Sequence, residues 1–246
     1  MTDDTAAERP AFYALTGGGW RDYWTLLHPP YTVWHLSYVV LGACVAPHLR
    51  VRWLVETLAA FFLAMGIAAH ALDELHGRPL GTRIPGALLV ALAIAGLTGA
   101  VGLGIHGASE VSPWIWVFIA VGAFLAPAYN LEWFGGAFHT ETWFALAWGA
   151  FPAATAGFAQ GGRLTPAIVL MAAGCAALSA VQRTLSTPVR RLRREVGEVS
   201  GSVTLRDGST EPLDAGTLRS TPETTLRLMS LAVPLVAAAL LVARLG

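Results

Sequence analysis

Seven apolar runs follow one another along the chain, separated by shorter polar stretches. The runs are Tyr31–Pro47, Trp53–Leu72, Ile84–Ile105, Pro113–Tyr129, Thr142–Phe158, Pro166–Val181 and Leu226–Val242. Each is close to the roughly 20 residues that an α-helix needs to cross a bilayer. The pattern therefore predicts an all-α protein, a polytopic transmembrane bundle of about seven helices.

The polar stretches divide the chain into four expected parts. Residues 1–30 are polar and aromatic, which is typical of a cytoplasmic or interfacial N-terminal segment. Residues 31–181 form a six-helix membrane core with polar cytoplasmic loops. Residues 182–225 form an arginine-rich cytoplasmic loop, in which an Asp-Gly pair predicts a small hairpin. Residues 226–246 form the last transmembrane helix.

The composition agrees with a protein whose surface faces hydrocarbon. Of 246 residues, 54% are hydrophobic and 13% are charged, whereas a soluble domain carries roughly 25% charged residues. The formal net charge is zero, so no nucleic-acid partner is expected. All 16 basic residues are arginine, which excludes mechanisms that need a lysine Schiff base.

The distribution of arginine predicts how the chain is oriented in the cell membrane. With a cytoplasmic N-terminus and an outer C-terminus, the cytoplasmic side holds Arg9, Arg21, Arg78, Arg83, Arg183, Arg190, Arg191, Arg193, Arg194, Arg206, Arg219 and Arg227. The outer side holds Arg50, Arg52, Arg163 and Arg244. Because basic residues concentrate in cytoplasmic loops, this orientation is the one we expect.

A first group of ionisable residues follows the second apolar run. On a helix, His70, Asp73 and Glu74 lie on one face. Two carboxylates beside an imidazole can hold a divalent cation such as Mg²⁺, either directly or as a bridge to a diphosphate. Arg78 can add a bidentate contact to phosphate oxygens. The alternative is that these are ordinary solvated residues at the end of a helix.

A second group lies in the cytoplasmic loop that follows the fourth apolar run. Glu132, His139 and Glu141 could supply further metal ligands or a general base, and Tyr129 and Asn130 could orient a substrate. The alternative is an aromatic belt at the membrane interface with solvated acids beside it.

A third group begins where the sixth run ends. Arg183 and Arg190 could clamp phosphate and face the first group. The arginines that follow, Arg191, Arg193 and Arg194, are better explained by attraction to anionic lipid headgroups.

The acidic group resembles a known motif. Asp73-Glu74, followed by Arg78-Pro79-Leu80-Gly81-Thr82, resembles the first Asp-rich motif of the UbiA-type intramembrane prenyltransferases. Tyr129-Asn130 falls where that family has a tyrosine-containing segment after helix four. The resemblance covers roughly Leu26 to Arg194. It implies a UbiA-like bundle that binds an isoprenyl diphosphate through Mg²⁺ and transfers the prenyl group to an aromatic or lipid acceptor.

The resemblance also implies roles for individual residues. Asp73, Glu74 and Tyr129 would be catalytic, with Asp73 and Glu74 holding the metal. The substrate would be bound by His70, Arg78, Asn130, Arg183 and Arg190. The family's second acidic motif has no counterpart here, since residues 182–194 supply arginine and no acid. Arg183 and Arg190 would therefore neutralise the diphosphate directly.

Two other functions remain open. A transition-metal enzyme would hold zinc or iron with histidine and carboxylate side chains, drawn from His70, Asp73, Glu74, His76, Glu132, His139 and Glu141. A non-catalytic member of the fold would bind a lipid or a partner protein through the arginine-rich loop.

Overall fold

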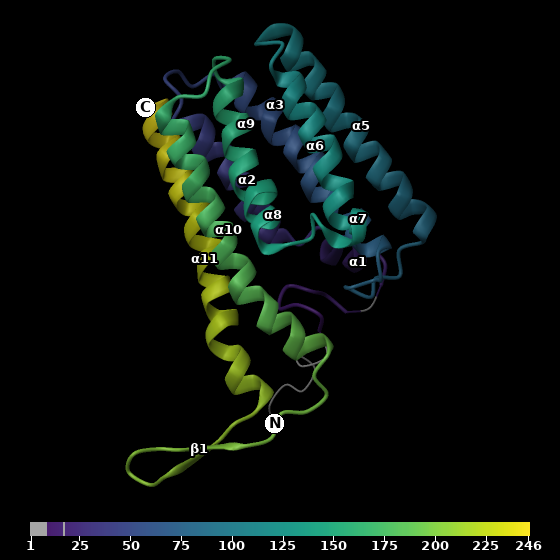
Figure 1. Cartoon of the computed structure of the whole chain (residues 1–246), viewed down its shortest axis with the longest axis vertical. Coiled ribbons are helices and arrows are strands. Elements are labelled where there is room, and N and C mark those ends of the chain that lie inside the picture. Colours follow the sequence, from purple (N-terminus) through teal and green to yellow (C-terminus); the bar gives the residue numbers. More distant parts are fainter. Residues whose placement is uncertain (1–8, 17) are drawn as a thin grey trace.

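The computed structural model describes residues 9–16 and 18–246, so residues 1–8 and Gly17 of the expected N-terminal segment lie outside it. The chain forms a bundle of helices with one small hairpin (Figure 1). In chain order the elements are α1 (Trp20–Leu26), α2 (Pro29–Cys44), α3 (Val51–Phe61), η2 (Phe62–Ala69), α4 (His70–Leu75), α5 (Gly86–Glu110), α6 (Ile115–Asn130), α7 (Trp133–Gly136), α8 (Glu141–Phe144), η3 (Ala145–Ala150), α9 (Phe151–Ala159), α10 (Pro166–Arg194), β1 (Ser202–Thr204), β2 (Thr210–Pro212) and α11 (Ala215–Leu245).

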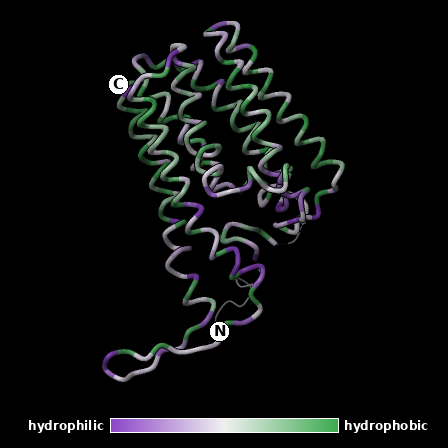
Figure 2. Tube along the Cα trace, in the orientation of Figure 1, coloured by the Kyte–Doolittle hydropathy of each residue, from purple (hydrophilic) through white to green (hydrophobic). Residues whose placement is uncertain are grey.

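Four helical segments of the described chain are long and apolar enough to cross a membrane. They are Val51–Leu75, which joins α3, η2 and α4 end to end, and the helices α5, α10 and α11. Helix α6 is apolar but shorter. Figure 2 shows hydrophobic positions along these helices and hydrophilic positions gathered at helix ends and in the hairpin. The helical class and a membrane-embedded character are thus supported, and the count of about seven crossing helices stays a prediction.

Helices α10 and α11 run side by side and project beyond the rest of the bundle, with the β1–β2 hairpin at their far end (Figure 1). Helix α11 begins at Ala215, where the Asp214 side chain accepts a 2.7 Å hydrogen bond from the Thr217 amide. The helix thus begins eleven residues before the apolar run Leu226–Val242. Since α10 also continues to Arg194, the loop between the two helices spans only residues 195–214.

A buried carboxylate ties this projecting pair together. Glu223 on α11 accepts from Arg193 of α10 at 2.7 Å and from Arg227 at 2.8 Å, and Arg219 lies 3.4 Å away. Arg193 also donates to the Arg9 carbonyl at 3.1 Å. The Arg193–Glu223 ion pair therefore joins the two helices, and the hydrogen bond from Arg193 joins them to the N-terminal segment.

Close helix contacts depend on small residues. Helix α2 has Trp34 and Tyr38 fully buried and packs on α9 and α11. At Gly42 a Cβ atom would lie only 2.0 Å from the Ala153 carbonyl oxygen of α9. Glycine thus lets the two backbones approach as membrane helices commonly do.

Wide π-helical turns interrupt two of the helical segments. Segment η2 leads directly into α4, and η3 lies between α8 and α9. A π-helical turn changes the rotation of the residues that follow it, and such turns are frequent at functional sites. The residue that follows η2 directly is His70, and Asp73 lies three residues farther along in α4.

We expect Gly42→Ala to lower the free energy of unfolding by about 1–3 kcal/mol, because the added methyl group overpacks the α2–α9 contact. Gly174 on α10 has open space around it, so Gly174→Ala is a matched control that should leave stability unchanged or slightly higher. Thermal unfolding in detergent measures both variants, and equal melting temperatures would contradict the prediction.

Candidate functional site

A cavity of about 870 Å³, its open mouth included, lies at the end of the bundle where α4, α6 and the polar part of α10 meet. Its walls also include α2, α8, η3 and the N-terminal segment at Pro10–Tyr13. Among the residues singled out from the sequence, the following line this one cavity: His70, Asp73, Tyr129, Asn130, His139, Arg183 and Arg190. Three separate polar stretches of the chain therefore converge here.

Positive charge dominates the cavity wall. Helix α10 contributes Arg183, Arg190 and Arg194, and among the described residues that line the cavity the only carboxylate is Asp73. Asp73 forms no ion pair or hydrogen bond through its side chain with any residue of the described chain, and neither does Arg190. An anionic ligand is the group that this excess of guanidinium charge attracts.

Arg183 is held in place by contacts with His139 and Phe144. Its Nη2 atom lies 3.5 Å from Nε2 of His139, and its guanidinium lies 5.6 Å from the centre of the Phe144 ring. The His139 Nδ1 atom is 3.0 Å from the Tyr129 carbonyl oxygen, which can only accept. His139 therefore donates through Nδ1, and its Nε2 lone pair faces Arg183.

Buried polar atoms in this wall lack a partner. Within residues 9–16 and 18–246, neither Nε of Arg183 nor the hydroxyl of Tyr129 has a hydrogen-bond partner. A buried polar group without a partner costs about 1–3 kcal/mol. Both atoms belong to cavity-lining residues, so a ligand oxygen placed there would satisfy them.

Imidazoles and phenols form the opposite wall. His28 and His70 stack with ring centres 4.3 Å apart, and the Tyr13 hydroxyl lies 2.6 Å from Nδ1 of His28. Burial lowers the pKa of His28 well below its ordinary value and raises the pKa of Tyr13, so both are neutral at pH 7. His35 is buried against Gln182, with 2.7 Å between Nε2 and Oε1.

The N-terminal segment and His28 carry no recognisable motif, so residue pattern alone does not mark them as part of a site. A proline pair after His28 was the one available indication of an unusual backbone.

Glu74 and Arg78 do not line the cavity. Glu74 is completely buried, and its two carboxylate oxygens accept from the Leu80 amide and from the amide and hydroxyl of Thr82 at 2.8–3.0 Å. Arg78 donates to the carbonyls of Thr82 and Ile84. In this conformation both residues shape the loop that follows α4, and the donor set does not fit a metal held jointly by Asp73 and Glu74.

Three of the remaining candidates, His76, Glu132 and Glu141, are exposed at the protein surface. Glu132 is 3.9 Å from His76 and 3.8 Å from His139, and both Glu132 and Glu141 are exposed. Asn130 lines the cavity, but its amide nitrogen donates to the Ala126 carbonyl at 2.7 Å. The described residues contain no group of three or more His, Cys, Asp or Glu that could hold a metal ion. Mg²⁺, zinc and iron stay predictions.

No family model, curated protein or solved structure matches the chain. The UbiA-like assignment therefore stays a prediction from the motif residues, and the site must be interpreted from its own geometry.

We expect Glu74→Ala to destabilise the protein by at least about 2 kcal/mol, because it leaves the loop donors at Leu80 and Thr82 buried without an acceptor. Limited proteolysis of residues 76–85 and thermal unfolding measure the effect. The exposed Glu141→Ala is the control and should behave like the unchanged protein. A stable Glu74→Ala protein that had lost only metal affinity would contradict the structural role.

Proposed function

We propose that the chain is an integral membrane protein that binds an isoprenyl diphosphate in this cavity and acts as a UbiA-like prenyltransferase. The observation that carries the proposal is a polar, arginine-rich cavity that adjoins open apolar cavities between the helices. Such a pair of environments suits an amphipathic ligand with an anionic head and a hydrocarbon tail.

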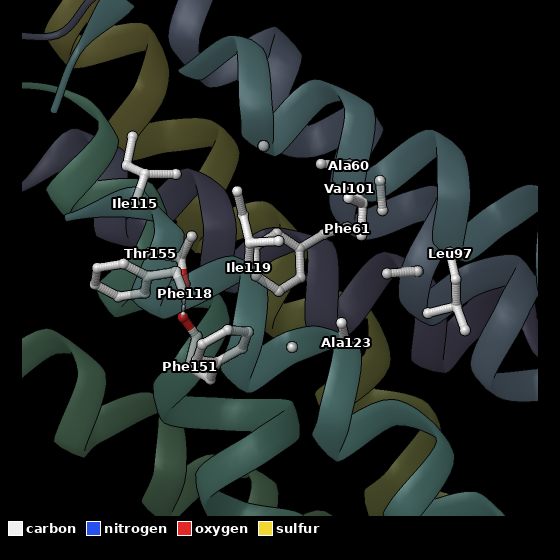
Figure 3. Close-up of a pocket in the computed structure, with 14 residues that line it drawn as sticks. Ala60, Phe61, Leu97, Val101, Ile115, Phe118, Ile119, Ala123, Phe151 and Thr155 are labelled. Atoms are coloured by element: carbon white, nitrogen blue, oxygen red, sulfur yellow. Dashed lines mark hydrogen bonds between the residues drawn. The ribbon is translucent and has the colours of Figure 1, made fainter. Parts of the chain in front are cut away.

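The apolar part begins at Trp148, which lines both the arginine-rich cavity and a cavity of about 360 Å³ between η2, α6 and η3. Four residues are shared between this second cavity and a third, of about 540 Å³: Phe61, Ala64, Gly122 and Phe151. Figure 3 shows the third cavity, where Phe61, Phe118 and Phe151 surround the space beside Ile119. Its wall is almost wholly apolar, as a prenyl tail requires.

In this proposal the arginines replace the family's second acidic motif. Arg183 and Arg190 neutralise the diphosphate as it leaves, and the Tyr129 hydroxyl donates to one of its oxygens. Trp148 lines both the polar cavity and the adjoining apolar one, and the rings of Tyr129 and Phe144 contact it on the polar side. In this proposal the three aromatic faces stabilise an allylic cation. Asp73 is the carboxylate available to this cavity for a metal or for positioning the second substrate.

A second candidate is lipid binding without turnover. The engagement of both Glu74 oxygens by the loop favours it, since this leaves one carboxylate where the family motif would provide two.

The decisive experiment uses the full chain in lipid nanodiscs with labelled geranylgeranyl diphosphate and a membrane lipid extract as the source of acceptor. Saturable binding with release of pyrophosphate is the expected result, measured with Mg²⁺ and again with EDTA. Binding without release would favour the second candidate. Absence of binding in both buffers would exclude both.

We expect Arg183→Ala and Arg190→Ala each to weaken geranylgeranyl diphosphate binding by about tenfold or more, because a charge-assisted hydrogen bond to the headgroup is lost. Arg191 is a neighbour on α10 that is exposed and does not line the cavity. Arg191→Ala is therefore the matched control, and its affinity should stay within about twofold. Equal losses in all three variants would indicate a general surface attraction.

We expect Gly122→Leu to shift the preference toward shorter prenyl chains, because the new side chain fills the space shared by the two apolar cavities. Competition between geranyl and geranylgeranyl diphosphate measures the shift. Gly102 on α5 has open space around it, so Gly102→Leu is the control. An unchanged preference in Gly122→Leu would place the tail elsewhere.

A further inference from the structure

The imidazole wall of the cavity contains a buried donor that the proposed function does not use. The Nε2 atom of His28 is buried and has no hydrogen-bond partner among residues 9–16 and 18–246. The ring lines the same cavity as the arginines, on the side of Tyr13 and His70.

The protonation of His28 follows from its neighbour. The Tyr13 phenol is protonated and buried, and Nδ1 of His28, 2.6 Å away, is the one acceptor for its proton in the described chain. Tyr13 therefore donates to Nδ1, and the proton of the neutral imidazole sits on Nε2. His28 thus holds a buried N–H donor within the cavity wall.

The His70 ring offers a hydrogen-bond acceptor, whereas His28 offers a donor. Its Nδ1 lies 3.1 Å from the Gly66 carbonyl oxygen, which can only accept, so the proton of His70 is on Nδ1. Its Nε2 is then a bare acceptor. The two rings are nearly parallel, at an interplanar angle of 11°, so that one stacked pair offers a donor and an acceptor.

The backbone at His28 does not explain this arrangement. His28 has φ 46° and ψ 55°, in the left-handed region, where glycine or asparagine would be less strained. Strained positions with a polar side chain directed at a cavity are frequent at ligand sites. The imidazole is therefore better explained by a ligand than by the turn.

We infer that His28, His70 and Tyr13 form a second subsite that binds the hydroxyl group of an uncharged, phenol-like ligand. A hydroxyl group both accepts and donates, so it can satisfy His28 and His70 together. A phosphate oxygen would face the lone pair of His70. The nearby rings of Phe12 and Tyr31, which also line the cavity, suit an aromatic body. Only the use of this subsite by an acceptor substrate rests on the proposed function.

The test uses the full chain in nanodiscs, labelled with ¹⁵N-histidine, without any diphosphate. The chain has seven histidines, so single substitutions assign each ring. We expect the Nε2–H tautomer at His28 and the Nδ1–H tautomer at His70. Phenol should move the Nε2 signals of both rings, whereas toluene, which lacks the hydroxyl, should not.

A matched pair of tyrosine variants completes the test. Tyr13→Phe removes the hydrogen bond that fixes the His28 tautomer and should weaken phenol binding by roughly two- to tenfold. Tyr23 is exposed on α1 and lies outside the cavity, so Tyr23→Phe should bind as the unchanged protein does. The opposite tautomer at His28, or equal responses to phenol and toluene, would overturn the inference. Because no diphosphate is present, either result is independent of the prenyl proposal.

Discussion

The cavity depends on one buried charge, the carboxylate of Glu223. A charge with this little exposure is tolerated only when cations and hydrogen bonds surround it, and Arg193, Arg219 and Arg227 meet that requirement. Because Arg193 also reaches the Arg9 carbonyl, the same group fixes the N-terminal segment that forms one wall. Arg183 and Arg190, which lie earlier in α10, form no ion pair within the described chain and line the cavity. Their positive charge is therefore available to bind an anionic ligand.

Two environments meet at Trp148, and their contrast limits which ligands suit the site. On one side lie guanidinium groups, and on the other lie cavities walled almost entirely by apolar side chains. Neither environment alone suggests a lipid ligand, since arginine could attract any anion and apolar gaps occur in many bundles. Because the arginine-rich cavity and the apolar cavities are adjacent, the site suits a ligand that has both an anionic group and a hydrocarbon chain.

Periodicity and residue type predicted the helical class and a membrane-embedded character, and they selected several of the residues that line the polar cavity. They did not predict the role of Glu74, because its partners at Leu80 and Thr82 become neighbours only when the following loop folds back. The apolar pattern alone also did not place the start of α11 at Ala215, where the Asp214 side chain caps the helix. His28 was missed since nothing local connects it to Tyr13 or His70, and that contact exists only in three dimensions.

The wall formed by the N-terminal segment has a consequence for biosynthesis. Arg193 and Arg194 hold the carbonyls of Arg9 and Pro10 across a separation of 184 residues in each case. The segment at Arg9 and Pro10 can therefore reach this position only after the chain has been synthesised through Arg194. Helices α2 to α9 are therefore synthesised before α10 can complete the cavity wall, so the site forms only once α10 is in place.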